Sequence, residues 1–232
     1  MKQDLLRGRL ALMSEPSYAL FSKKLKTSQR EILGVRVPRL TALAKELAKA
    51  EGVSFLDDFF LYPSVCYEEV ILAYKLFGLL KLDIQGKTHY LDELLAYNDS
   101  WASNDCLCSS FTDPKHDPKG YWPVIRGYLD SSNPWDIRFA TIAMMTNYLT
   151  DEYTSEVLEL LKAVQSEHYY VNMGLAWAFA TAVAKQRDRA LPYLHTGVLN
   201  EEVRKKAIQK CIESFRVSEE DKALLRLMRQ TP

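Results

Sequence analysis

Apolar residues recur at helical spacing along almost the whole chain, and no stretch shows the sustained alternation that is typical of a strand. Four prolines, Pro63, Pro114, Pro118 and Pro134, stand between the apolar segments or at their first turns, where a missing N–H group does least harm to a helix. The pattern therefore predicts an all-α fold. Shorter amphipathic segments, which we interpret as outer helices, are predicted at residues 87–97, 118–131, 152–164 and 187–195.

The inner segments between them repeat. Four of them place a β-branched residue shortly before a small one, and they begin at Val70, Ile137, Val171 and Val203. The last three begin 34 and then 32 residues apart, while the first two are 67 apart, which leaves room for one more unit near Trp101. A period of this length with two helices per unit is typical of HEAT-like solenoids, whose helix pairs bury their apolar faces by stacking. We therefore predict a single domain over residues 1–232, an α-solenoid of about six helix pairs.

The inner helices of such a solenoid line a concave face. Three polar residues directly follow the repeated β-branched position, namely Arg138, Asn172 and Arg204. Long polar side chains at equivalent positions favour a surface that follows a phosphate backbone, although inner helices also carry polar residues that are merely solvated.

Charge is distributed unevenly in a chain whose formal net charge is zero. Residues 1–50 hold eleven basic and four acidic residues, whereas residues 51–100 hold three basic and nine acidic ones. A neutral protein of this kind can still present a basic face to nucleic acid. No apolar run approaches the roughly 20 residues that span a bilayer, so we expect a cytoplasmic protein without membrane contact.

Cysteine and histidine give no metal site. The four cysteines are sparse, and the pair Cys106 and Cys108 with His116 nearby lacks the doubled ligand spacing of zinc sites. Buried thiols are therefore the expectation, with no metal and no other cofactor.

Trp101 and Asp105 stand four residues apart, so a helix places an aromatic ring and a carboxylate on one face. Hydrolysis of a glycosidic bond passes through a cationic sugar, which a fixed carboxylate stabilises and an aromatic face attracts. The alternative is structural, with Trp101 packed between repeats and Asp105 paired with Arg138.

Four segments resemble those of a known family, in the right order and at the right distances. They are Gly34–Leu40 leading into Leu43–Lys45, Trp101–Asp105, Trp135–Ala140 and Tyr169–Ala180. Together they resemble the AlkD-like DNA alkylation repair family, over nearly the whole chain from about Tyr18 to Arg229.

The resemblance implies a HEAT-like repeat protein that excises cationic N3- and N7-alkylated purines from duplex DNA without a metal and without flipping the base. By resemblance, Asp105 matches the carboxylate that stabilises the oxocarbenium-like sugar and orients water. Trp101 and Trp177 match the aromatic pair that contacts the deoxyribose of the lesion, and Arg138 matches an arginine that holds a backbone phosphate.

Two further cations, Arg204 and Lys210, are expected on the concave face, where they add affinity for DNA of any sequence. Duplex DNA is then the expected partner. Monomer is the expected state, because a capped solenoid needs no second copy to close its core.

The amino end departs from the family's pattern. The stretch Met13–Leu25 leaves less room for a full second helix, and Ser28–Leu33 is predicted to form a loop. This end resembles a divergent branch that lacks the helix inserted into the minor groove. Three functions therefore stay open: an alkylpurine glycosylase, a non-catalytic DNA-binding protein of the same fold, and a protein-binding scaffold.

Overall fold

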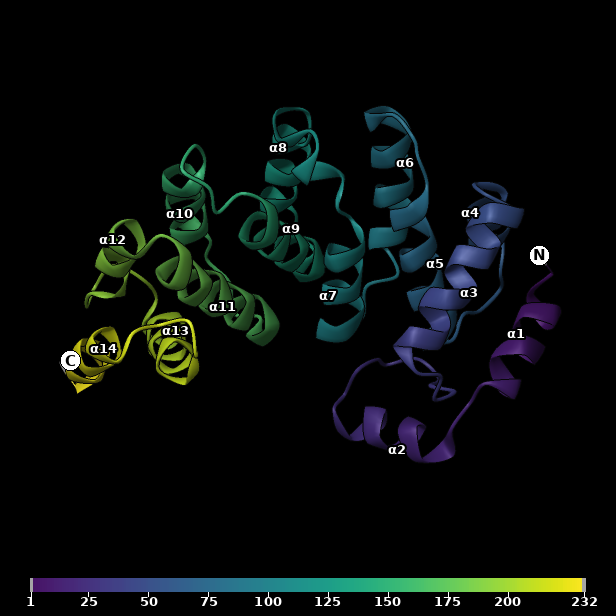
Figure 1. Ribbon diagram of the computed structural model, residues 1–232, viewed down its shortest axis with the longest axis horizontal. Coiled ribbons are helices and arrows are strands. Elements are labelled where there is room, and N and C mark those ends of the chain that lie inside the picture. The colour runs from purple at the N-terminus through teal and green to yellow at the C-terminus, as the bar shows by residue number, and fades with distance from the viewer. Residues whose placement is uncertain (1, 231–232) are drawn as a thin grey trace. The chain divides into compact units, whose positions relative to one another are not determined.

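In this computed structural model the chain is described over residues 2–230, and those residues form helices and loops with no strand among them (Figure 1). The chain divides into two compact units, Met1–Tyr121 and Trp122–Pro232, and the division falls within one helix. The single domain expected over residues 1–232 stays a prediction, and each unit is described by itself.

The first unit contains α1 (Gln3–Leu12), α2 (Pro16–Lys24), α3 (Val37–Ala50), α4 (Ser54–Phe60), α5 (Tyr67–Leu79), α6 (Ile84–Leu95), α7 (Trp101–Ser110), the 3-10 turn η1 (Asp113–Lys115) and the start of α8 (Pro118–Gly127). Helix α5 packs between α3 and α7 and also contacts α4 and α6. Its side chains are buried over most of its length, including Val70, Leu72 and Phe77. This central helix is therefore the core of the first unit.

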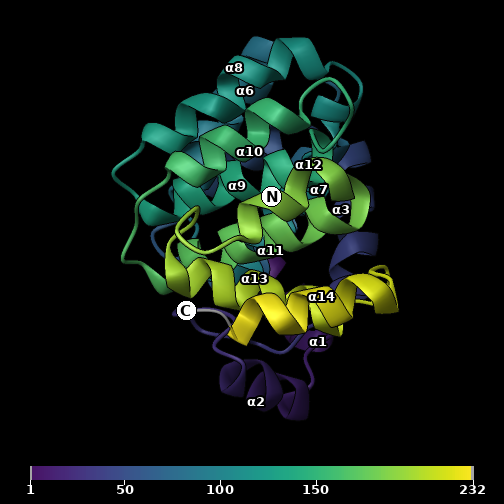
Figure 2. The same cartoon turned by 90° about the vertical axis from the view of Figure 1, so that its left-hand side faces the viewer.

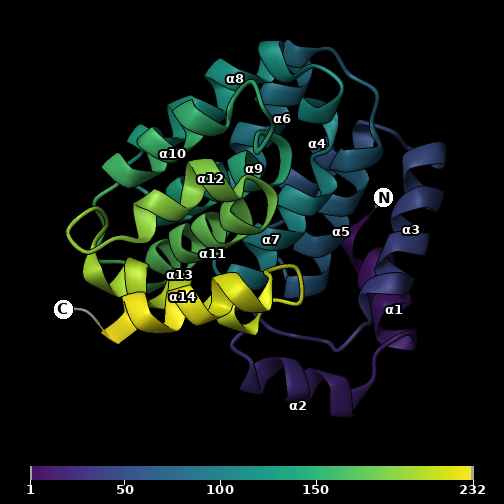
Figure 3. The same cartoon turned by 60° about the vertical axis from the view of Figure 1, so that its left-hand side comes forward.

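The second unit contains the rest of α8, η2 (Tyr128–Asp130), α9 (Pro134–Asn147), α10 (Thr154–Ala163), α11 (Tyr169–Lys185), α12 (Arg187–Ala190), η3 (Leu191–Leu194), α13 (Glu201–Glu213) and α14 (Glu219–Gln230). Helix α11 packs between α9 and α13, and α14 packs on α13 (Figure 2). The shorter helices α10 and α12 lie together on one side of α11 and α13 (Figure 3).

Each unit is thus a stack of inner helices with further helices beside them, and the predicted all-α solenoid class is confirmed. The four outer helices expected from the sequence are present as α6, as α8 with η2, as α10, and as α12 with η3. Their apolar faces are what made them predictable, because a buried stripe at helical spacing is a local property of the sequence.

Small residues let the inner helices approach closely. Ala140 and Ala207 are fully buried, and a methyl group at Gly174 would lie 3.3 Å from the Arg138 guanidinium. A closer approach occurs at Gly78 of α5, where an added methyl group would overlap the main-chain oxygen of Ser110 in α7. Only glycine fits there without displacing one of the two helices.

Candidate functional site

Helix α7 carries both residues of the predicted catalytic pair. It begins after Ser100, which is extended and whose hydroxyl accepts a hydrogen bond from the Ser103 N–H at 3.2 Å. This cap fixes Trp101 as the first helical residue and puts Asp105 one turn later on the same face. Both side chains are partly buried.

Trp101 and Asp105 line one cavity of about 320 Å³ in the first unit. Four helices contribute to it: α2, the first turn of α3, α5 and α7. Apolar and aromatic side chains form most of its wall, and Lys75 of α5 brings a positive charge to it. The other lining residues are Tyr18, Phe21, Ser22, Leu25, Thr27, Val37, Tyr67, Ile71, Ala102, Cys106 and Ser109.

The charges in this cavity act on the Cys106 thiol. Burial raises the pKa of Cys106, the positive charge of Lys75 opposes that rise, and the negative charge of Asp105 adds to it. Burial also raises the pKa of the Tyr67 hydroxyl. Cys106 and Tyr67 are therefore neutral near pH 7.

Helix α2 is held over this cavity by the residues that begin α7. The indole Nε1 of Trp101 donates a hydrogen bond of 3.2 Å to the Leu25 oxygen, just after α2 ends. The Ser100 hydroxyl donates to the Thr27 oxygen. The orientation of the Trp101 ring therefore depends on the position of the amino-terminal segment.

Asp99 fixes the loop that follows α2. Its Oδ2 accepts hydrogen bonds from the Ser28 hydroxyl at 2.7 Å and the Gln29 N–H at 2.9 Å, and it lies 2.8 Å from Nη1 of Arg30. These contacts join residues about 70 positions apart in the sequence. The loop is thus attached directly to the start of the helix that carries Trp101 and Asp105.

The sequence predicted less room for a full second helix at the amino end and a loop over Ser28–Leu33. The loop is confirmed, since residues 27–36 form no helix. A second helix does form, because Pro16 occupies a first-turn position and the chain can turn directly into α2, which has nine residues. Membership of a divergent branch that lacks the helix inserted into the minor groove stays a prediction.

In the second unit, Arg138 of α9 is almost completely buried, and its Nη1 donates a hydrogen bond of 2.6 Å to the Tyr170 oxygen of α11. Gly174 leaves space for this guanidinium against α11. Arg138 thus joins two inner helices, and a contact with DNA phosphate stays a prediction for it.

Arg204 of α13 is fully buried, which the sequence analysis did not anticipate. Its guanidinium pairs with both carboxylate oxygens of Glu201, at 2.7 and 2.9 Å, and donates to the Met228 oxygen at 3.1 Å. In this position Arg204 joins α13 to α14, which is a structural role. The burial of Arg204 gives no support to the DNA contact predicted for it.

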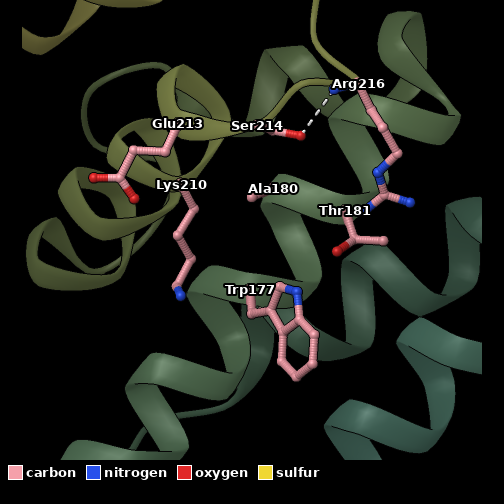
Figure 4. A pocket seen from close by; sticks show the side chains of 7 residues that line it. All are labelled: Trp177, Ala180, Thr181, Lys210, Glu213, Ser214 and Arg216. Carbon is pink, nitrogen blue, oxygen red and sulfur yellow. Dashed lines mark hydrogen bonds between the residues drawn. The ribbon is translucent and has the colours of Figure 1, made fainter.

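Trp177 and Lys210 line a second cavity, which lies within the second unit (Figure 4). Trp177 is 38% exposed on α11, a large fraction for a tryptophan. The structure therefore brings the predicted residues together in two pairs, Trp101 with Asp105 and Trp177 with Lys210.

Sequence reasoning missed Lys75 and Arg216, which line the first and the second cavity respectively. Neither belongs to a motif or to the repeated position, so no local signal separated them from the other basic residues. It also missed the buried carboxylate of Glu68, which holds the main chain after Ile32.

Over residues 2–230, no group of three or more His, Cys, Asp or Glu side chains is placed to hold a metal ion. In the same part of the chain, no helix is long and apolar enough to cross a membrane.

A family model described as DNA alkylation repair enzyme matches residues 6–212. A search of curated proteins found no match to the chain. The matched residues include both cavities' tryptophans, Asp105 and Lys210. Because the match covers most of the chain, this protein belongs to the family of DNA alkylation repair enzymes.

Proposed function

We propose that this protein is a DNA glycosylase that hydrolyses the N-glycosidic bond of N3- and N7-alkylated purines in duplex DNA. The observation that carries the proposal is the pair Trp101 and Asp105, which line one open cavity beside a mostly apolar wall. Membership of the DNA alkylation repair family supports the same reaction.

The departure of the alkylated base needs little help from the protein. An alkylated purine already carries a positive charge, so when the bond from C1′ to the base nitrogen breaks, its electron pair neutralises the departing base. No acid has to protonate the base, and the positive charge moves to the sugar. The protein's task is then to stabilise that cationic sugar and to supply water to it.

In the proposed reaction Asp105 performs this task. Its carboxylate stabilises the oxocarbenium-like sugar by charge, orients a water molecule toward C1′, and accepts the proton as the new C–O bond forms. The Trp101 ring, held through its Nε1 by the Leu25 oxygen, offers a face for the deoxyribose. Attraction between that face and the developing positive charge adds to the effect of the carboxylate.

The experiment compares wild type with Asp105→Asn in the release of 7-methylguanine and 3-methyladenine from methylated duplex DNA. We expect Asp105→Asn to slow release by about 100- to 1000-fold, the usual effect of removing one electrostatic group from an active site, with DNA affinity largely kept. Asp4→Asn is the matched control, because Asp4 is exposed on α1 and does not line the cavity. A folded wild type that releases no base above the spontaneous rate would disprove the proposal.

A second candidate is a non-catalytic DNA-binding protein of the same fold. The observation that favours it is the short α2, since a nine-residue helix offers limited surface for holding a bent duplex, whose deformation costs several kcal/mol. This candidate predicts DNA affinity that falls as salt rises but no base release. A protein-binding scaffold, by contrast, would show no salt-dependent affinity for DNA.

A further inference from the structure

The second cavity has the composition of a phosphate site. It measures about 200 Å³ and lies between α11 and α13, with the turn after α13 closing one end (Figure 4). Its lining residues are Trp177, Ala180, Thr181, Lys210, Glu213, Ser214 and Arg216. Two of these are cations and two carry hydroxyl groups, while Trp177 provides an aromatic face.

The two cations approach from different elements. Lys210 extends from α13 and Arg216 from the following turn, on either side of the α11 residues (Figure 4). The one acid of the cavity, Glu213, directs its carboxylate away from Trp177 in the same view. The net charge facing the space in front of Trp177 is therefore positive.

The turn that carries Arg216 is locally ordered. Ser214 caps the end of α13, and its hydroxyl accepts a hydrogen bond of 3.2 Å from the Arg216 N–H. This hydrogen bond uses the Arg216 main chain and not its guanidinium. Between them, Phe215 is fully exposed to solvent.

Phe215 is therefore an exposed aromatic ring directly beside a basic residue, and proteins that bind unpaired nucleotides combine these two features. Basic side chains follow the backbone there, and aromatic rings stack on bases. A ring presented this way also serves as a wedge against a base step of a duplex. Phe215 and Arg216 lie beyond the residues that the family model matches, so family membership assigns them no role.

We propose that the cavity in front of Trp177 binds a DNA strand, with Lys210 and Arg216 each contacting one phosphodiester, and that Phe215 stacks on an unpaired or unstacked base next to it. This inference rests on the proposed function only in taking DNA as the partner. It adds contacts in the second unit, through Lys210, Phe215 and Arg216, that act on binding and not on the chemistry at Asp105.

The phosphate contact is tested by measuring DNA affinity against salt for wild type, Arg216→Ala and Lys210→Ala. Each variant should weaken binding to all sequences and lower the slope of log affinity against log salt by about 0.9, the contribution of one phosphate contact. Arg226→Ala is the control, since Arg226 is an exposed arginine of α14 outside the cavity. Circular dichroism and thermal unfolding of each variant verify that the fold is intact.

The stacking contact is tested with Phe215→Ala on two duplexes, one fully paired and one with a two-nucleotide bulge. We expect binding to the bulged duplex to weaken by about tenfold with an unchanged salt slope, because stacking on one base contributes without any phosphate. Leu61→Ala, which removes another exposed apolar side chain, should leave both affinities unchanged.

The outcomes separate this inference from the proposed function. If wild type releases alkylated bases while the Arg216, Lys210 and Phe215 variants all bind DNA like wild type, the inference is wrong and the proposed glycosylase stands. If wild type releases no base but the variants lose affinity as described, the inference stands without the enzyme. If wild type binds no DNA at all, both are wrong.

Discussion

The buried carboxylate of Glu68 offers the sharpest test of how the cavity is built. Glu68 is 1% exposed in the first turn of α5, and it accepts hydrogen bonds from three successive main-chain N–H groups. Its Oε1 accepts from Gly34 at 2.7 Å and Val35 at 3.2 Å, and its Oε2 accepts from Leu33 at 2.9 Å. This one side chain therefore holds the segment that connects α2 to α3.

The substitution Glu68→Gln keeps the size and removes the charge. In its best placement the glutamine oxygen replaces Oε1 and still accepts hydrogen bonds from the Gly34 and Val35 N–H groups. Its NH₂ group then replaces Oε2 and faces the Leu33 N–H, so that two donors oppose each other. One buried donor left unpaired costs about 1–3 kcal/mol, and the two remaining bonds lose about 1 kcal/mol each without the charge. We therefore expect the free energy of unfolding to fall by about 3–5 kcal/mol.

Urea unfolding at pH 7, followed by circular dichroism, measures this change. Glu46→Gln is the control, because Glu46 is 59% exposed and pairs with Arg9 on the surface, where such pairs contribute about 1 kcal/mol or less. A change below about 0.5 kcal/mol in Glu68→Gln would show that Glu68 does not hold the segment as described.

Further predictions concern packing, acid stability and the electrostatics of α13. Gly78→Ala should lower the free energy of unfolding by about 1–3 kcal/mol, because the added methyl group overpacks against α7. Gly8→Ala should instead raise the free energy of unfolding by about 0.5–1 kcal/mol, because nothing lies within 4 Å of its added methyl group. Urea unfolding measures both changes. The hydrogen bond from Arg204 lowers the pKa of Glu201 to about 2, below its usual 4.5. Stability from this carboxylate is therefore fully present above pH 4.5 and is lost as the pH falls toward 2, so Glu201→Gln should flatten the dependence of unfolding on pH in that window. An unchanged pH profile in Glu201→Gln would contradict this role.

Most of the helical architecture could be predicted from the sequence because it depends on local patterns. Apolar spacing placed the inner and outer helices, and the Trp101–Asp105 spacing placed both side chains on one face of α7. The small residues that follow the repeated β-branched position, such as Ala140 and Gly174, lie where inner helices pack closely.

The position of Arg204 could not be predicted in the same way. Directly after the β-branched position of a repeat, an arginine can turn toward the groove or toward the next helix, and helical spacing alone does not separate these directions. Glu201, three residues earlier, was the available signal, because an acid at that distance can pair with the arginine as it becomes buried. The second partner, the Met228 oxygen, lies 24 residues away and leaves no local trace.

The cavity at Asp105 is likewise a product of contacts between distant segments. Helix α7 supplies Trp101 and Asp105, but α2 and its following loop supply the facing wall, and Asp99 joins the two segments through Ser28 and Gln29. Because the Trp101 indole is itself bound to the Leu25 oxygen, a change in the amino-terminal segment also changes the orientation of that ring in the cavity. The amino end therefore acts on the proposed reaction through the shape of the cavity, whether or not it also holds DNA.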